Sequence, residues 1–194
     1  LLKEEDKIIS NASCTTNNAA SMLWVLEKIT PIESASITTI HSYTSDQKIH
    51  DSPHKDLRRA RSAGVSIIPT TTGAAKTIGD ILPSLKGKIK GSSFRVPVAN
   101  GSITEITIMG NKEISKADIN NAMKEAAKTE LKNILSYTEE PLVSSDIIGL
   151  KESCLCDGSL TQVNKGLIKV VGWYDNEIGY SNRLIDLAMK INSF

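Results

Sequence analysis

The order of apolar and polar residues divides the chain into short strands, a few amphipathic helices and one long polar loop. Apolar residues at helical spacing predict helices over residues 14–29, 73–82, 115–130 and 176–191. Runs rich in Ile, Val and Thr predict strands over residues 36–43, 94–98, 103–109, 153–163 and 167–174. Residues 44–64 are polar and irregular, and a loop of that length inside a compact domain is usually functional or disordered.

Local signals mark the ends of several of these elements. Pro31 disfavours a helical conformation at Thr30, so the first helix ends there. Ser115 and Asp118 resemble a capping box at the start of the third helix. Residues 164–166, Asn-Lys-Gly, predict a turn between the last two strands.

Consecutive strands followed by helices, without regular βαβ alternation, predict an α+β fold. We expect a single domain over residues 1–194, with a mixed, largely antiparallel sheet and helices packed on one face. No G-x-G-x-x-G occurs, and residues 73–77 lack the Gly-Lys-Ser/Thr order of a phosphate loop. We therefore expect no Rossmann domain in these residues. In the last helix, Ile185, Ala188 and Met189 form one apolar stripe.

Composition narrows the class of protein. The net charge of +1 gives no general attraction to nucleic acid or to anionic membranes. No apolar run approaches the roughly 20 residues of a transmembrane helix, and residues 1–7 show no signal-peptide pattern. Three cysteines, an odd number, argue against a disulfide scaffold and for a reducing compartment. We expect a cytoplasmic protein.

Cys14 and His41 form the first candidate for chemistry. A short apolar run precedes Cys14 and a helix follows it, so Cys14 should lie in the first turn, with Ser13 as the cap. Backbone N–H groups and the helix dipole would lower the pKa of its thiol and make it a nucleophile. Histidine suits the role of acid and base because its pKa lies near neutral pH. From spacing alone, a buried cysteine and a core histidine explain the pair better, because an isolated Cys/His pair is a weak signal.

Four arginines, Arg58, Arg59, Arg61 and Arg95, are candidates for binding anions. Arginine binds phosphate through a planar fork of donors, and Thr44 and residues 70–73 supply hydroxyls and backbone amides. From composition alone, a solvated charged loop explains residues 54–61 better, since charge runs usually face water. A nucleic-acid site is disfavoured, because the chain is nearly neutral and has no recognisable binding module.

Cys154 and Cys156 alternate in a predicted strand, so both sulfurs lie on one face. A metal site would need further ligands at suitable spacing, and none is evident. We predict two core cysteines and no metal site.

Three segments together resemble a known family. They are Ser-Asn-Ala-Ser-Cys-Thr-Thr-Asn at residues 10–17, Thr-Ile-His-Ser-Tyr-Thr-Ser-Asp-Gln at residues 39–47 and Trp-Tyr-Asp-Asn-Glu-Ile-Gly-Tyr-Ser at residues 173–181. They are similar to the motifs of phosphorylating glyceraldehyde-3-phosphate dehydrogenases and occur in the same order. The resemblance covers essentially the whole chain, but only the carboxyl-terminal, catalytic part of a family member. It implies that the amino-terminal nucleotide-binding domain is missing here.

The resemblance implies a glycolytic oxidoreductase that converts glyceraldehyde 3-phosphate to 1,3-bisphosphoglycerate through a Cys14 thioester, with His41 as acid and base. It implies that Thr44 and Arg95 hold the substrate phosphate. Ser13, Thr15, Arg59, Thr72 and Gly73 would surround the inorganic phosphate. Asn176 and Tyr180 would contact the nicotinamide of NAD, which is bound mainly by the missing domain. Family members are typically homotetramers, and Pro53 matches those that use NAD.

Two alternatives stay open. The substrate could be erythrose 4-phosphate, although residues 43–44 and 73–76 resemble the triose enzymes more. As an isolated fragment, the chain could also be a non-catalytic assembly or binding domain. The family often has a second cysteine four residues after the nucleophile, and this chain has Asn18 there.

Overall fold

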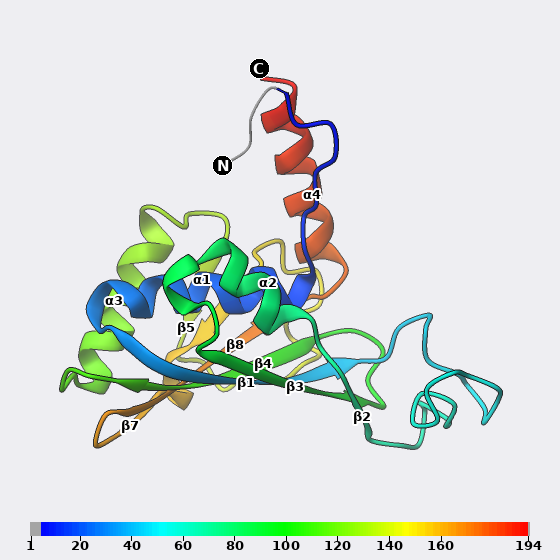
Figure 1. Ribbon diagram of the computed structural model, residues 1–194. Helices are drawn as coiled ribbons and strands as arrows, with labels where there is room; N and C mark the ends of the chain where they lie inside the picture. The colour runs from blue at the N-terminus through cyan, green and yellow to red at the C-terminus, as the bar shows by residue number, and fades with distance from the viewer. Residues whose placement is uncertain (1–4, 194) are drawn as a thin grey trace.

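The structure, a computed structural model, describes residues 5–193. An eight-stranded sheet forms its centre, with α1, α2 and α3 on one face and α4 projecting away from the sheet (Figure 1). The helices are α1 (Cys14–Ile29), α2 (Ala74–Ile81), α3 (Lys116–Lys128) and α4 (Ile178–Ile191), with short 3-10 helices at Pro83–Leu85 and Gly158–Leu160. The strands are β1 (Ile32–Ser42), β2 (Ile68–Thr70), β3 (Ile89–Val96), β4 (Ser102–Gly110), β5 (Leu135–Thr138), β6 (Cys154–Asp157), β7 (Gln162–Asn164) and β8 (Leu167–Tyr174).

The sheet is mixed and largely antiparallel, as the sequence predicts. Its strand order is β2-β3-β1-β4-β8-β6-β5, and β7 pairs with β8 outside this path. β1 pairs in parallel with β3, and β5 pairs in parallel with β6. The other pairings between these described strands are antiparallel. The predicted α+β fold with helices on one face is confirmed.

Helix α1 is the central helix of this layer. Ser13 caps it by accepting a hydrogen bond from the Thr16 N–H at 3.0 Å, and the helix ends at Thr30, before Pro31, as predicted. Its buried face includes Met22, Leu23 and Leu26, all with no exposed surface. This face joins the apolar core that the sheet and the other two helices form around it.

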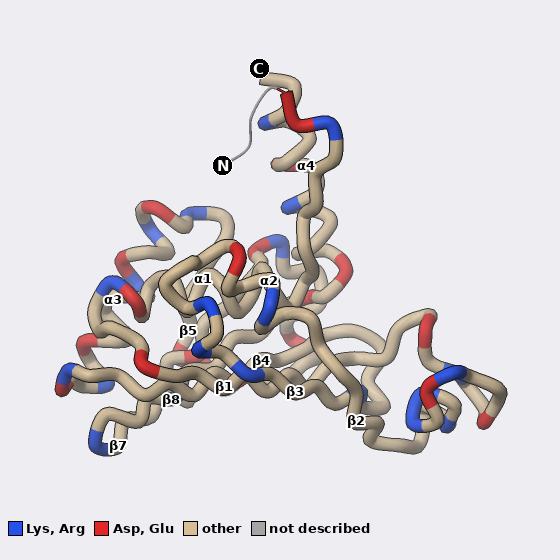
Figure 2. Tube along the Cα trace, in the orientation of Figure 1, with Lys and Arg blue, Asp and Glu red and all other residues tan. Residues whose placement is uncertain are grey.

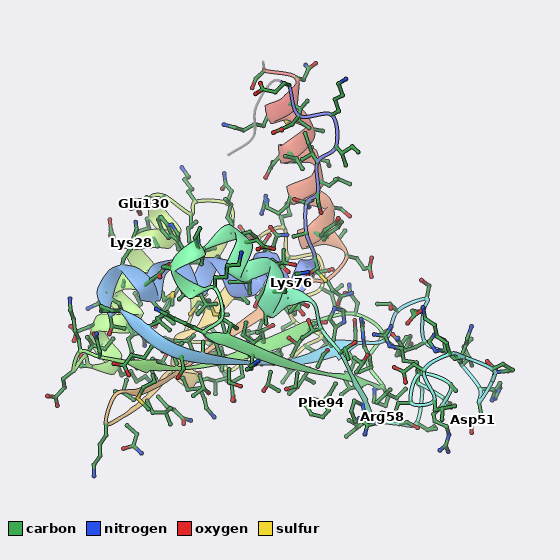
Figure 3. The ribbon with its side chains drawn as sticks, in the orientation of Figure 1. Lys28, Asp51, Arg58, Lys76, Phe94 and Glu130 are labelled. Carbon is green, nitrogen blue, oxygen red and sulfur yellow. The ribbon has the colours of Figure 1, made fainter. Side chains whose placement is uncertain are left out.

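A glycine in β8 lets α1 lie close to the sheet. A Cβ atom at Gly172 would lie 2.7 Å from Cys154 Sγ, 2.7 Å from Met22 Cε and 3.0 Å from Asn18 Nδ2. Two of these contacts come from α1, so the absence of a side chain at Gly172 sets how closely the helix approaches the strand. At the far end of the layer, Lys28 Nζ donates to Glu130 Oε1 at 2.7 Å, and both side chains are labelled in Figure 3.

The strand boundaries differ from the predicted ones in instructive ways. The predicted strand 153–163 is two strands, β6 and β7, separated by a 3-10 turn at residues 158–160. The Asp157 carboxylate causes this break, because it accepts from the backbone N–H of Ser159 at 3.1 Å and closes the turn. β1 and β3 both begin earlier than predicted, because β1 pairs with β4 from Ile32 onward and β3 pairs with β1 from Ile89 onward.

Two short strands, β2 and β5, are missing from the predictions. β2 has three residues and contains Pro69, and β5 has four. Strands of this length show too little alternation to be recognised, and only their pairing with β3 and β6 identifies them. The predicted turn at residues 164–166 is confirmed, with φ of 47° at Lys165 and 84° at Gly166, as a two-residue hairpin requires.

Two parts of the chain extend beyond the core. The apolar stripe of α4 is largely exposed, with Ile185 at 59% and Met189 at 68% of their maximum exposure. The loop between β1 and β2 extends past the end of the sheet and carries many of its charged residues in a cluster (Figures 1 and 2). Pairs within it include Arg61 with Asp51 at 2.9 Å. None of the described helices is long and apolar enough to span a bilayer.

We expect Gly172→Ala to destabilise the fold by about 1–3 kcal/mol, because the added methyl group overpacks the contact between α1 and β8. The measurement is the midpoint of urea unfolding. Gly64→Ala is the matched control, since its Cβ would meet no atom within 4 Å. That variant should change the free energy of unfolding by less than about 0.5 kcal/mol. Equal effects of the two substitutions would contradict this account of the helix position.

Candidate active site

A cavity of about 400 Å³ lies where two helices begin and two strands end. It opens between the first turn of α1, the first turn of α2, and the ends of β1 and β3. The residues that line it and that the sequence singled out are Ser13, Cys14, Thr15, His41, Thr72, Gly73 and Arg95. Four other predicted site residues, Thr44, Arg59, Asn176 and Tyr180, do not line it.

Cys14 is the first residue of α1, as predicted. The loop before it is tightened by Asn17, whose side-chain amide donates to the carbonyls of Asn11 at 3.0 Å and Ser13 at 2.9 Å. Ala12 has a φ of 59°, a left-handed conformation that costs a non-glycine residue about 1–2 kcal/mol. The loop therefore holds a strained backbone directly before the cap, and this turn directs Cys14 into the cavity.

His41 meets Cys14 across the cavity. Cys14 Sγ lies 3.5 Å from His41 Nε2, although 27 positions separate the two residues. His41 is near the end of β1, and the parallel pairing places it directly beside Arg95 of β3. The ring of Tyr174 packs edge-on against the imidazole, with 5.9 Å between ring centroids. The cysteine and histidine that the sequence proposed as a pair are therefore in contact.

Burial shifts the pKa of each member of this pair toward its neutral form. It raises the pKa of the Cys14 thiol above its ordinary value, although hydrogen bonds from Thr15 and the charge of Arg95 act in the opposite direction. Burial, followed by the positive charge of Arg95, lowers the pKa of His41 to about 4. The expectation that the helix dipole lowers the thiol pKa is thus wrong for this structure, because desolvation of the thiolate outweighs the N-terminal field.

Arg95 is the cation of the cavity. Its Nη1 lies 2.8 Å from the carbonyl oxygen of Ser42 and 2.7 Å from His41 Nδ1. Its Nε is buried and has no hydrogen-bond partner among the described residues. Along β3, Ser93 and Arg95 face the cavity, whereas Phe94 lies on the helix-free face (Figure 3). The charge is thus partly buried and incompletely satisfied, as in a site prepared for an anion.

The first turn of α2 forms the opposite wall. Thr72 and Gly73 line the cavity, and Thr72 Oγ1 accepts from the Ala74 N–H at 3.2 Å. Thr71 and Thr77 also line it. Hydroxyls and backbone N–H groups at two helix starts therefore face a space that also contains a guanidinium, an arrangement suited to a phosphate group.

Arg59 and Thr44 lie in the neighbouring loop and are occupied there. Arg59 forms a short ion pair with Asp46, and its Nε donates to Thr70 Oγ1 at 2.8 Å. Thr44 donates through its hydroxyl to Gln47 Oε1 at 3.1 Å. The positive charge of Arg59 lowers the pKa of Arg95, after the larger effect of burial, so the two guanidinium groups lie within electrostatic range.

Asn176 lies behind β1, in a network that fixes its amide. Its Oδ1 accepts from Ser42 Oγ at 2.8 Å, from Ser102 Oγ at 2.9 Å and from the Gly101 N–H at 3.3 Å. Its Nδ2 donates to the Glu177 carboxylate at 3.0 Å. Because Glu177 is exposed, Nδ2 is the side of the amide that a ligand could reach.

Tyr180 follows in the first turn of α4 and is half-buried. Its carbonyl oxygen accepts a hydrogen bond from the Asn11 side chain at 3.5 Å. This contact connects α4 to the loop that precedes Cys14.

The structure adds residues that the sequence interpretation missed. Tyr174 is buried beside His41 and shares a hydrogen bond of 2.9 Å with Thr15 Oγ1, the residue next to Cys14. Asp175 is fully buried and accepts from the N–H groups of Gly149, Glu177 and Ile178. Both residues lie within the family-like segment 173–181. Their place in that long segment was the only sequence feature that indicated a role for them.

Cys154 and Cys156 are fully buried core residues, as predicted. Within residues 5–193, no group of three or more His, Cys, Asp or Glu side chains is arranged to hold a metal ion.

Comparison with known proteins agrees with this geometry. Residues 13–176 match the family described as glyceraldehyde 3-phosphate dehydrogenase, C-terminal domain. Similar curated proteins include glyceraldehyde-3-phosphate dehydrogenase 2 of Streptomyces avermitilis, 54% identical over 96% of this chain. Glyceraldehyde-3-phosphate dehydrogenase of Borreliella burgdorferi is 53% identical over 95%. The chain spans 56% of the length of each of these two relatives. The match covers most of the chain, including Cys14 and His41, and the chain therefore belongs to the family of glyceraldehyde 3-phosphate dehydrogenase C-terminal domains.

Proposed function

We propose that the protein oxidises glyceraldehyde 3-phosphate to 1,3-bisphosphoglycerate, with Cys14 as the nucleophile and His41 as acid and base. The observation that carries this proposal is the 3.5 Å contact between Cys14 Sγ and His41 Nε2 inside a cavity that also holds Arg95. The oxidation of an aldehyde through a thioester needs a nucleophile, a base and a binding site for the substrate phosphate. These three requirements meet in one cavity.

The chemistry follows from the two neutral groups. Sγ attacks the aldehyde carbon, and its proton passes through His41 Nε2 to the new hydroxyl oxygen, giving a hemithioacetal. His41 then takes the hydroxyl proton while the carbon loses hydride, which leaves a thioester on Cys14. Attack by inorganic phosphate forms a carbon–oxygen bond and breaks the carbon–sulfur bond, so the sulfur recovers a proton from His41. Each proton is taken and returned by the same imidazole.

This mechanism needs binding sites for two anions, the phosphate group of the substrate and the attacking inorganic phosphate. For the substrate phosphate, we propose Arg95 with Thr44, supported by the buried and unpartnered Nε of Arg95. For the attacking phosphate, we propose Ser13, Thr15, Arg59, Thr72 and Gly73. Ser13, Thr15, Thr72 and Gly73 line the cavity. Arg59 would exchange its pairing with Asp46 for the ligand, since that contact is partly exposed.

The hydride acceptor is proposed to be NAD, which supplies an oxidised nicotinamide ring when bound. Asn176 fits the nicotinamide ring. Its Oδ1 already accepts three hydrogen bonds, whereas its Nδ2 donates only to the Glu177 carboxylate, which a ligand could replace. Nδ2 would then donate to the nicotinamide carboxamide, with Tyr180 nearby. Most contacts to the dinucleotide would come from a nucleotide-binding domain outside these residues.

We propose that the working protein is a cytoplasmic homotetramer. Apolar side chains exposed on α4 and on the loop after β1, among them Ile185, Met189, Ile49, Leu57 and Val65, support burial against further protein surface. Free thiols at all three cysteines support a reducing compartment.

The activity test measures absorbance of reduced nicotinamide on mixing the protein, at its full natural length, with glyceraldehyde 3-phosphate, phosphate and NAD. We expect turnover that Cys14→Ser abolishes. His41→Asn should lower the rate by about 10²–10⁴, because general acid–base help is lost. His50→Asn, in the exposed part of the loop, is the matched control and should leave the rate unchanged.

Erythrose 4-phosphate is compared in the same assay. Faster turnover of this aldehyde would replace the proposed substrate. An unchanged rate in His41→Asn would remove His41 from the mechanism.

The raised pKa of Cys14 predicts how its reactivity depends on pH. A thiol whose pKa is raised above its ordinary value is mostly protonated at neutral pH, so its thiolate fraction rises about tenfold per pH unit. Alkylation by iodoacetamide, followed by mass spectrometry, should accelerate continuously from about pH 7 to about pH 9. The fully buried Cys154 and Cys156 should stay unmodified. A rate that reaches a plateau near neutral pH would contradict the proposed resting state.

A further inference from the structure

Asn100 and Gly101 form the only Asn-Gly pair in the sequence, and they lie in the turn between β3 and β4. In such a pair the backbone nitrogen of the glycine can attack the side-chain amide of the asparagine, because glycine has no side chain to block the approach. The reaction converts asparagine to aspartate or isoaspartate without an enzyme. In a folded protein, the local geometry decides whether the two groups can meet.

The structure holds the two reacting groups in contact. The Gly101 N–H donates a hydrogen bond to Asn100 Oδ1 at 2.8 Å. Because Oδ1 is bonded to Cγ, the Gly101 nitrogen lies beside the carbon atom that it would attack. An attack between groups held together in this way has the rate advantage of an intramolecular reaction.

The fold also keeps a glycine after Asn100. Gly101 has a φ of 92°, in the left-handed region that favours glycine. A Cβ atom at this position would collide with the carbonyl oxygen of Ser144. A bulkier neighbour, which would slow the attack, therefore does not fit this turn.

The Asn100 amide is a hydrogen-bond donor to a buried carboxylate. Its Nδ2 donates to Asp175 Oδ2 at 3.0 Å, and Asp175 is fully buried. Although burial raises the pKa of Asp175, hydrogen bonds from three backbone N–H groups and from Asn100 bring this pKa below its ordinary value. Asp175 is therefore ionised at neutral pH. An aspartate at position 100 would replace the donor with a second negative charge, and the two carboxylates would repel each other.

The same turn contacts the amide that we propose for the nicotinamide. The Gly101 N–H lies 3.3 Å from Oδ1 of Asn176, the residue that follows Asp175. Repulsion between residues 100 and 175 would move the turn and remove this donor from Asn176. Isoaspartate would act more strongly, because its main chain passes through the former side chain and lengthens the turn by one carbon atom.

We propose that Asn100 is a site of spontaneous deamidation, and that the product weakens binding at the nicotinamide end of the site. The Gly101 nitrogen forms a bond to Asn100 Cγ, and the bond between Cγ and Nδ2 breaks. The proton of the Gly101 nitrogen, passed through solvent, leaves with Nδ2 as ammonia. Water then opens the resulting succinimide to aspartate or isoaspartate. The effect on NAD rests on the proposed function, whereas the modification itself does not.

The first experiment stores the unmodified protein, at its full natural length, at mildly acidic and at mildly alkaline pH and follows each asparagine by peptide mass spectrometry. We expect loss of ammonia or a gain of one mass unit at Asn100, faster at alkaline pH because the deprotonated nitrogen is the nucleophile. A sample digested before storage corrects for changes during digestion. Asn111, which is exposed and precedes Lys112, is the internal control and should react more slowly.

Asn100→Gln is the matched variant for this experiment. It keeps the side-chain amide, but attack on its longer side chain would have to form a six-membered ring, so it should stay unmodified. A rate at Asn100 no higher than the rate at Asn111 overturns the proposal. This comparison uses the unmodified protein, so it does not depend on the folding of any variant.

The second experiment measures NAD binding by equilibrium dialysis, without turnover. Asn100→Asp reproduces one product and should weaken NAD binding by about tenfold, because Asp175 loses a donor and faces a like charge. Asn111→Asp makes the same change at an exposed position and should bind NAD as the unmodified protein does. If Asn100→Asp fails to fold, stored protein compared with stored Asn100→Gln gives the same answer.

The outcomes separate this inference from the proposed function. Equal NAD affinity of Asn100→Asp and the unmodified protein rejects the effect on the nicotinamide end. Absence of NAD binding in every protein, the unmodified one included, rejects the proposed function, and the mass spectra still decide whether Asn100 is modified.

Discussion

The close approach of α1 to the sheet is the constraint on which the site depends. Met22 and Asn18 of the helix lie against the backbone of Gly172, and the helix cannot move outward without opening the core. The same rigid helix carries Cys14 at its first residue. Its position against β8 therefore decides whether Sγ reaches the imidazole of His41 on β1. A site built on packed elements in this way keeps its geometry without a bound ligand.

The parallel pairing of β1 and β3 adds the second half of the site. It sets His41 and Arg95 side by side, whereas an antiparallel pairing would bring a different residue to each position. This neighbour has two effects on the imidazole. Its charge helps to keep His41 neutral, and its N–H groups compete with the ring for the Ser42 carbonyl. Arg95 thereby connects the proposed anion-binding site with the pKa of His41.

The state of Cys14 shows two physical effects in competition. The N-terminus of a helix favours a thiolate, typically by up to about 1–2 kcal/mol. Removal of the sulfur from water disfavours the charge, and in this cavity that effect is larger, so the pKa of the Cys14 thiol is raised. Burial therefore shifts the pKa of both Cys14 and His41 toward their uncharged forms.

The sequence by itself determined the local features: Ser13 as the cap, Cys14 in the first turn, Pro31 as the end of the helix and the turn at residues 164–166. Each of these features depends on interactions between residues only a few positions apart, so a short stretch of sequence is enough to predict it. Motif resemblance also indicated the family, which the comparisons confirmed. Tertiary structure alone decided the contact of His41 with Arg95, the edges β2 and β5, and the pKa of Cys14. These depend on burial and on strand register between distant segments, and no short stretch of sequence carries that information.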